Sequence, residues 1–363
     1  MIIREKEPAN LEMPFGTLDG PITPNDKFYV RSHFPVPPID LASWRLQIEG
    51  AVERPLELSY QDLLDHPLTT VPATMECAGN SRIFLLPKVK GVQWEMGAVG
   101  NAEWTGVSLG ELLREARCAP QACEVILEGA DSGAIAEPPR PAGKICYARS
   151  LSLGKALRDV LLALRMNGEP LSPAHGFPLR AIVPGWYGMA AVKWLHRIIV
   201  TERPFHGYYQ TVDYTFWERG AGGAGIVPIT EMLVKAAIAR PGSHEMIAAG
   251  VNYRVRGAAW TSDAEIVRVE ISANDGQTWM EASLGENPSP NSWRLWHYDW
   301  PVPGAPGPCR LLARATDSRG RTQSMERDPD RGSYMINHCL PVEVEIVTQA
   351  SGLSGRAGVS PAG

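Results

Sequence analysis

Several signatures that would assign this 363-residue chain to a common protein class are missing. None of its six cysteines forms a Cys-x-x-Cys pair, which argues against a zinc site, a redox dithiol or an attached haem. Such scattered thiols suit a reducing compartment. No Gly-x-Gly-x-x-Gly motif opens a strand–helix unit and no Walker-type loop is present, so a nicotinamide dinucleotide or a nucleoside triphosphate is not expected.

Long hydrophobic runs and charge of one sign are also scarce. No uninterrupted apolar segment is long enough to cross a bilayer, and the N-terminus lacks a basic start followed by an apolar run. We therefore expect a cytoplasmic protein with no membrane partner. A formal net charge of only −5 argues against nucleic acid as a bulk electrostatic partner. Any anion site must be a local cluster of basic residues.

Proline and glycine, by contrast, are abundant, with 31 and 35 residues, and favour short strands and loops. Residues 1–40 are expected to form an extended arm because their prolines forbid regular helix. Helical spacing of apolar residues predicts helices at 109–116 and 153–166, and strands are expected at 44–48, 69–75, 124–127, 179–183 and 198–201. The first part of the chain therefore predicts an α+β fold with mixed sheets.

The pattern changes after a glycine-rich stretch at 220–225, which we expect to be flexible and to lead into a domain junction. Alternation at 267–272 predicts a strand, Asn274-Asp275-Gly276 predicts a hairpin turn, and further strands are expected at 277–282, 311–315 and 342–347. These features predict an immunoglobulin-like β-sandwich. We therefore expect one domain over residues 1–228, a sandwich over 229–349 and a disordered tail at 350–363.

One cysteine lies in a turn of small residues. Cys77 follows the expected strand at 69–75 and is part of the sequence Glu76-Cys77-Ala78-Gly79-Asn80-Ser81-Arg82. A free cysteine is commonly buried, so an inert core thiol is the default interpretation. A thiolate is also a soft ligand for a transition metal, and glycine lets bulky groups approach its sulfur.

Basic residues follow in separate segments. Arg31 and His33 share one side of an extended segment, and Lys90 precedes Trp94 across a glycine. A surface salt bridge and a capping histidine would explain Arg31 and His33 equally well, and a solvated lysine and a core tryptophan are the simpler interpretation of Lys90 and Trp94.

A later group of basic residues lies at expected strand ends. His175, Arg180 and Lys193 flank Gly-Pro turns, where their side chains can converge on an anion such as a phosphate. Tyr214 offers a phenol as a hydrogen-bond donor, although a buried tyrosine bonded to backbone is the simpler interpretation.

Taken in order, these segments resemble the sulfite oxidase family of molybdenum enzymes over residues 10–348. The resemblance rests on Arg31-Ser32-His33, the turn at 76–82, the segment 90–94, the stretch 97–107, His175 to Arg180, the segment 192–195 and Asp213-Tyr214. The stretch Asn274-Asp275-Gly276-Gln277-Thr278-Trp279 resembles the dimerisation domain of that family, which implies a homodimer.

The resemblance implies roles for individual residues. Cys77 would be the protein's thiolate ligand to molybdenum in a molybdenum–molybdopterin cofactor, held in a catalytic domain formed by residues 1–228. The pterin and its phosphate would be held by His33, Asp131, His175, Arg180 and Lys193. The substrate pocket would be lined by Arg31, Arg82, Lys90, Trp94 and Tyr214, with Arg331 as the nearest match to a further pocket arginine from the C-terminal domain.

The implied reaction is oxidation of sulfite to sulfate by oxygen-atom transfer. Animal relatives carry a haem domain ahead of this unit, for which this chain has no room, so no haem is expected. Electrons would then pass to an external acceptor, whether a cytochrome, another carrier or dioxygen.

Other activities are also compatible with these residues. A nitrate reductase shares the scaffold and the cysteine but has asparagine where the oxidases have the pocket tyrosine, so Tyr214 favours sulfite. A different oxyanion or an S-oxide is a further alternative. A thiol hydrolase using Cys77 with His175 or His196 would leave Arg31, Arg82 and Lys90 without a task.

Overall fold

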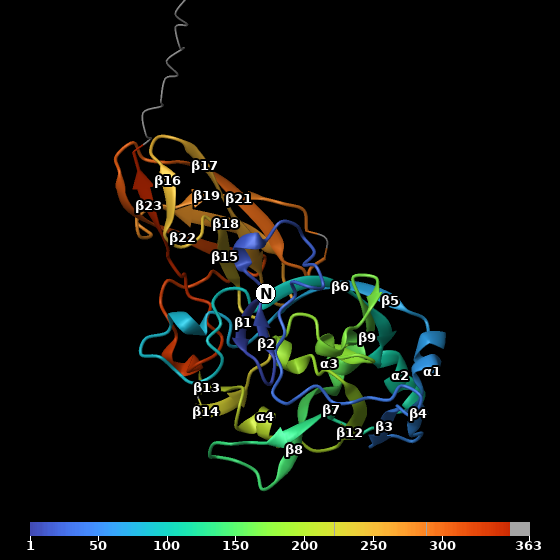
Figure 1. Cartoon of the computed structure of the whole chain (residues 1–363). Helices are drawn as coiled ribbons and strands as arrows, with labels where there is room; N and C mark the ends of the chain where they lie inside the picture. Colours follow the sequence, from blue (N-terminus) through green and yellow to red (C-terminus); the bar gives the residue numbers. More distant parts are fainter. Residues whose placement is uncertain (221, 288, 349–363) are drawn as a thin grey trace, which may run out of the picture.

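The structure is a computed structural model that describes residues 1–220, 222–287 and 289–348. Figure 1 shows the strands up to β14 in its lower part and the strands from β15 onwards in its upper part. The expected tail at 350–363 lies outside the described residues. Among the described residues, no helix combines the length and apolarity needed to span a bilayer.

Two five-stranded sheets organise the first half of the chain. One has the order β10 (Glu169–Pro170), β9 (Leu161–Met166), β6 (Val99–Ser108) and β5 (Thr69–Glu76), with β11 (Arg180–Ile182) also pairing with β9. The other has the order β4 (Leu56–Leu58), β3 (Leu46–Gly50), β12 (Leu195–Thr201), β7 (Glu124–Ala134) and β8 (Lys144–Ser152). Strand β12 runs parallel to β3 and antiparallel to β7, so the second sheet is mixed as expected.

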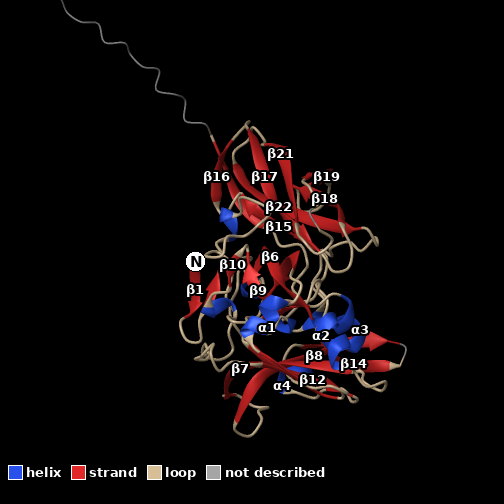
Figure 2. Ribbon diagram, turned by 90° about the vertical axis from the view of Figure 1, so that its right-hand side faces the viewer, coloured by secondary structure: helices blue, strands red, loops and turns tan. Residues whose placement is uncertain are grey.

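Short helices fill the space between these sheets, as both views show (Figures 1 and 2). They are α1 (Tyr60–Asp65), α2 (Leu109–Ala116) and α3 (Leu153–Arg158), and a further short helix α4 (Tyr208–Thr211) lies beside β8. The Ser59 and Asp62 side chains form a capping box that starts α1. Helix α2 buries Leu109, Leu112 and Leu113 in the core, which confirms the helix predicted there.

The helix expected at 153–166 is wrong over its second half. Helix α3 ends at Arg158, and Leu161–Met166 forms strand β9 in the centre of the first sheet. Its leucines are buried on both faces, and a short apolar run of this kind has no periodicity that separates a strand from a buried helix.

The remaining segments of the first half form hairpins and single turns of 3₁₀ helix. Strands β1 (Ile2–Glu5) and β2 (Asn10–Glu12) form a hairpin in the expected extended arm, and β13 (Thr215–Gly220) pairs with β14 (Gly223–Pro228). The glycine-rich stretch expected to be flexible thus lies largely in a hairpin. The 3₁₀ turns are Phe15–Thr17, Arg82–Phe84, Pro173–His175, Gly188–Ala190 and, in the second half, Pro329–Arg331.

Two packed sheets form the second half and confirm the β-sandwich. One has the order β15 (Lys235–Arg240), β17 (Asn252–Trp260), β21 (Arg294–Pro301) and β20 (Ser283–Leu284). The other has the order β16 (Glu245–Ala248), β23 (Val342–Val347), β22 (Gly307–Asp317), β18 (Ile266–Ser272) and β19 (Met280–Glu281). The strand expected at 277–282 is therefore only two residues long. Val269, Leu311 and Trp296 from both sheets share one buried core.

Buried contacts join the two halves. The Thr74 amide donates to the Asn291 carbonyl at 2.8 Å, and the Met335 amide donates to the Ala78 carbonyl at 2.8 Å. Trp260 and Trp293 of the sandwich half belong to the same buried cluster as the core of the first half. A domain boundary near residue 228 stays a prediction. It is consistent with the sheet topology, in which the strands after β14 pair only within the two sandwich sheets.

Candidate functional site

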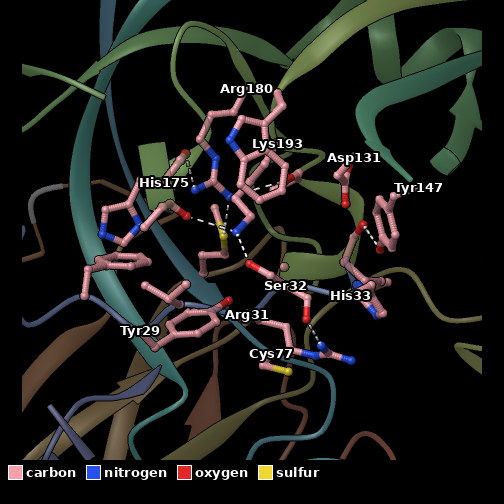
Figure 3. A pocket seen from close by; sticks show the side chains of 18 of the residues that line it. Tyr29, Arg31, Ser32, His33, Cys77, Asp131, Tyr147, His175, Arg180 and Lys193 are labelled. Atoms are coloured by element: carbon pink, nitrogen blue, oxygen red, sulfur yellow. Dashed lines mark hydrogen bonds between the residues drawn. The ribbon is translucent and has the colours of Figure 1, made fainter. Parts of the chain in front are cut away.

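A cavity of about 620 Å³ lies where the segment 28–33, the end of β5, strands β7 and β8 and the segments after Pro173 and Tyr187 meet (Figure 3). Eight of the predicted site residues line it: Arg31, His33, Cys77, Asp131, His175, Arg180, Lys193 and Tyr214. Segments far apart in the sequence thus bring together all six predicted cofactor-binding residues.

Cys77 is buried at one side of this cavity, with 6% of its surface exposed, directly after β5. Its amide donates to the Ala98 carbonyl at 2.8 Å, which ties the turn to the segment leading into β6. Burial raises the pKa of the Cys77 thiol, whereas the charges of Arg31 and Arg82 lower it. A metal ion would add the positive charge that favours its thiolate.

Gly79 is required in this turn by a close approach. A Cβ atom at Gly79 would lie 2.3 Å from a terminal nitrogen of Arg82, so any larger residue would displace that guanidinium. The small residue at position 79 therefore leaves space for the Arg82 guanidinium, in the same turn that carries Cys77.

Arg31 lies beside Cys77 and has no carboxylate within 4 Å among the described residues. Its Nη1 atom donates to the Ser32 carbonyl and, at 3.3 Å, to Asn10 Oδ1. A partly buried guanidinium whose partners are all neutral retains the capacity to bind an anion.

Tyr214 and His33 face each other in the same cavity, with Oη and Nε2 2.7 Å apart. Burial raises the pKa of Tyr214 more than the nearby Arg31 lowers it, so the phenol is protonated and can donate. Burial, Arg31 and Lys193 lower the pKa of His33, so its ring is neutral near pH 7. The Tyr214 backbone has a φ of 52°, which is unusual for a bulky residue and is commonly retained at functional sites.

A second cluster of basic groups surrounds the other side of the cavity (Figure 3). Lys193 Nζ donates to Ser32 Oγ at 2.8 Å and to the Ala174 carbonyl at 2.9 Å. Arg180 donates to the His175 carbonyl at 3.1 Å, and its buried Nε atom has no partner within the described part of the chain. Burial lowers the pKa of Arg180 to about 10, and no carboxylate of the described residues forms a salt bridge with it.

The acidic member of the cluster is Asp131. Burial raises its pKa to about 7, although the charge of Lys193 opposes this shift. Burial and the charge of Arg180 lower the pKa of Lys193 well below its ordinary value. Burial and the same arginine lower the pKa of His175 to about 4. These shifts share one cause, which is the removal of several ionisable groups from water.

Three residues predicted for the substrate pocket do not line the cavity. Arg82 is buried behind Cys77, where it donates to the Val92 carbonyl at 3.0 Å and the Ser333 carbonyl at 3.1 Å. Lys90 is exposed and pairs with Glu137 at the tip of the β7–β8 hairpin. Trp94 is fully buried, and its ring packs against Tyr29 with centroids 6.5 Å apart.

Arg331 also lies outside the cavity, with its Nε atom 2.9 Å from Asp328 Oδ2. The residue of the C-terminal half that reaches the site is Tyr334. Its ring lies 5.0 Å from the ring of Tyr214, and the Arg82 guanidinium lies 5.0 Å above it. Nothing in the sequence marks Tyr334, because its position beside Tyr214 depends on how the chain folds back after the 3₁₀ turn Pro329–Arg331.

Sequence reasoning also missed Ser32 and Tyr147. Ser32 accepts a hydrogen bond from Lys193, and its place between Arg31 and His33 was a usable signal. Tyr147 stacks on His33 with ring centroids 4.7 Å apart and comes from β8, which carried no motif.

The residues of the cavity fit the molybdenum–molybdopterin cofactor that the sequence implied. One thiol lies at one side of the cavity and can act as a soft ligand. Buried cations with an unpartnered guanidinium nitrogen lie at the other side and suit a phosphate.

Comparison with known proteins gives two matches to family models. Residues 33–209 match an oxidoreductase molybdopterin binding domain, and residues 227–336 match a Mo-co oxidoreductase dimerisation domain. The chain is 34% identical to mitochondrial sulfite oxidase from Mus musculus, over 88% of this chain and 61% of that protein. It is 37% identical to the enzyme of that name from Drosophila melanogaster, over 88% of this chain and 58% of that protein.

Two further relatives have different names. A nitrate reductase from Aspergillus niger is 35% identical over 76% of this chain and 34% of that protein. The sulfane dehydrogenase SoxCD from Paracoccus pantotrophus superposes with a TM-score of 0.80 at 29% identity, covering 93% of this chain and 85% of that chain. The chain spans about 60% of the length of the curated sulfite oxidases that it matches.

Proposed function

Because this chain belongs to the sulfite oxidase family of molybdopterin-dependent oxidoreductases, we propose that it oxidises sulfite to sulfate by oxygen-atom transfer. The observation that supports this best is the arrangement around Arg31. A guanidinium without a carboxylate partner among the described residues lies beside a buried thiol and a protonated phenol in one cavity. This combination suits a small oxyanion next to a thiolate-bound metal.

The cofactor would be held by residues that line the cavity. Cys77 would bind the molybdenum, and His33, Asp131, His175, Arg180 and Lys193 would hold the pterin and its phosphate. When bound, the molybdenum centre supplies the transferable oxygen atom and accepts the two electrons. A phosphate would offset the charges of Arg180 and Lys193, whose pKa values burial lowers.

The chain's own groups would bind and orient the substrate. The Arg31 guanidinium binds the oxyanion and the Tyr214 hydroxyl donates to it, and both are held in place before the substrate arrives. His33 orients the phenol through the 2.7 Å contact between Nε2 and Oη. Arg82 acts from behind Cys77, where its positive charge lowers the pKa of the thiol.

The assembly and the electron acceptor are parts of the same proposal. We propose a homodimer, which the match to a dimerisation domain supports. Electrons would pass to an external acceptor such as a cytochrome, another carrier or dioxygen. A cytoplasmic location stays a prediction from the sequence.

The second candidate activity is the conversion of another oxyanion or an S-oxide, with nitrate as the first to test. The nitrate reductase relative supports it, because this chain is 35% identical to that protein over 76% of its own length, against 34% over 88% for the sulfite oxidase from Mus musculus. Tyr214 favours sulfite, since the nitrate-specific pattern has asparagine there.

The decisive experiment uses the full chain purified from molybdenum-replete cells. Molybdenum and pterin are measured per protein, and sulfite oxidation is then assayed with ferricyanide, alongside nitrate reduction with a reduced viologen dye. We expect one molybdenum per chain and sulfite-dependent ferricyanide reduction. Absence of stoichiometric molybdenum would refute the proposal, and nitrate turnover without sulfite turnover would replace it by the second candidate.

A further inference from the structure

A buried ion pair joins the C-terminal sandwich to the turn that carries Cys77. Lys235, the first residue of β15, places Nζ 2.8 Å from Glu76 Oε1. Both residues are only 2% exposed. Trp260, at the end of β17, donates from Nε1 to Glu76 Oε2 at 2.9 Å. Each oxygen of the carboxylate is thus bonded by a residue of the sandwich.

Lys235 also bonds the far end of the same turn. Its Nζ donates to Ser81 Oγ at 3.0 Å, and Asn80 Nδ2 donates to Glu76 Oε1 at 3.0 Å. Ser81 has a φ of 74°, so the turn is in a conformation that its own backbone does not favour. The ammonium group of Lys235 therefore connects Glu76, which precedes Cys77, to Ser81, which lies four residues after Cys77.

Such a pair is poorly explained as a source of stability. Two charges removed from water lose hydration that their mutual attraction only partly restores, and apolar pairs of similar volume often stabilise a core equally well. A fully hydrogen-bonded buried pair does fix the positions and orientations of its side chains, because each hydrogen bond restricts the groups that it joins.

We propose that Lys235 and Trp260 are positioning residues for Cys77. They hold the carboxylate of Glu76, and Glu76 fixes the turn that presents the Cys77 sulfur to the cavity. The inference rests on the proposed function only in taking that sulfur as the metal ligand. The C-terminal sandwich, which matches a dimerisation domain, would then also help to fix the geometry of the site.

The test compares Lys235→Met with Lys155→Met. Lys155 is a matched control because it is also a buried lysine, only 3% exposed, and its ammonium group pairs with Asp159 at 2.9 Å. Both lysines also lie near a tryptophan ring: Lys155 is 5.9 Å from the ring of Trp186, and Lys235 is 5.8 Å from the ring of Trp260. Lys155 contacts neither the turn nor the cavity. Both full-length variants should lose thermal stability.

The first readout needs no cofactor. Full-length protein from cells that cannot make molybdopterin is treated with iodoacetamide, and alkylation of the peptide containing Cys77 is followed by mass spectrometry. We expect several-fold faster alkylation of Cys77 in Lys235→Met than in the wild type, and no change in Lys155→Met. Equal rates in the two variants would overturn the proposal.

The second readout uses the loaded enzyme, with rates expressed per bound molybdenum. Lys235→Met should lower kcat by about 10- to 100-fold, the usual effect of losing a group that orients a metal ligand. KM for sulfite should change little, because Arg31 and Tyr214 are untouched. A kcat equal to that of Lys155→Met would contradict the positioning role.

Trp260→Phe keeps the test decisive if Lys235→Met does not fold. It removes the N–H donor and keeps a smaller aromatic ring, so Cys77 alkylation should rise by a smaller factor, and an unchanged rate would count against the proposal. If the wild type contains no molybdenum, the proposed function fails while the alkylation experiment still reports on the turn.

Discussion

Arg31, Arg180 and Lys193 surround one cavity, and none of them forms a salt bridge among the described residues. Exposed lysines and arginines elsewhere, such as Lys90 and Arg219, pair with carboxylates. Burying cations without partners costs free energy, so such groups are retained where an anion binds.

Arg31 and Lys90 provide a direct comparison. We expect Arg31→Met to lower kcat/KM for sulfite by about 10- to 100-fold, the loss that corresponds to one charge-assisted hydrogen bond of roughly 1.5–3 kcal/mol. Lys90→Met should stay within about twofold of the wild type, since an exposed ion pair contributes little. Steady-state assays with ferricyanide measure both, and equal losses would show that the loop of Lys90 closes onto the substrate.

Cys77→Ser tests the sulfur itself. The hydroxyl fits the volume of the thiol, so we expect an unchanged circular dichroism spectrum with activity lost. Sulfite turnover retained in this variant would show that the sulfur is not a required ligand.

His175 predicts how stability depends on pH. Its pKa is lowered to about 4 in the folded chain, so between pH 6.5 and 4 the unfolded chain binds the extra proton. The contribution of His175 to stability should therefore fall with acidification across this window, by at most about 1.4 kcal/mol per pH unit, whereas Asp131, whose folded pKa is about 7, contributes with the opposite sign. Urea titrations of the cofactor-free chain measure the slope, which His175→Gln should reduce. His338, whose pKa is also lowered to about 4, supplies a similar contribution that this variant leaves intact.

The secondary-structure elements show where local sequence is sufficient. Helix α2 is predictable because its apolar residues recur at helical spacing over two turns and end at Arg117, which adopts a left-handed conformation. Strand β9 is not predictable in this way, because Leu161 to Met166 owes its conformation to pairing with β6 and β11, which are separate segments of the chain. The same holds for the site. The sequence predicted the cavity residues that lie at strand ends. It could not predict the contribution of Tyr334 or the positions of Lys90 and Trp94, because these depend on the conformations of loops.

Strand β6 offers a test of this close pairing. A Cβ atom at Gly106 would lie 1.9 Å from the Leu162 carbonyl oxygen, so Gly106→Ala should destabilise the fold by at least about 1–3 kcal/mol. Gly154 in α3 has no atom within 4 Å of its Cβ position, so Gly154→Ala should stabilise by about 0.5–1 kcal/mol. Chemical denaturation of both variants measures these changes, and a neutral Gly106→Ala would contradict the register of β6 against β9.

At the scale of the whole molecule, the two halves share buried structure. Trp260 and Trp293 lie in the core of the first half, and Glu76 would become an unpaired buried charge if the sandwich separated from it. The net charge of −5 coexists with a cationic cavity, so anion binding is a local property of the site.

Shared structure predicts cooperative unfolding. We expect a single calorimetric transition for the full chain, with far-ultraviolet circular dichroism and tryptophan fluorescence giving coincident curves. Two resolved transitions would show that the sandwich unfolds independently of the Cys77 turn.

The backbone of Tyr214 also bears on the history of the site. A φ of 52° is unfavourable for tyrosine but is readily adopted by asparagine. Asparagine is the residue that the resemblance to nitrate reductases implies at this position for a nitrate-specific site, and its codons differ from those of tyrosine only in the first base. A single nucleotide change would thus relieve the backbone strain at this position, and under the proposed function it would also remove the phenol that favours sulfite.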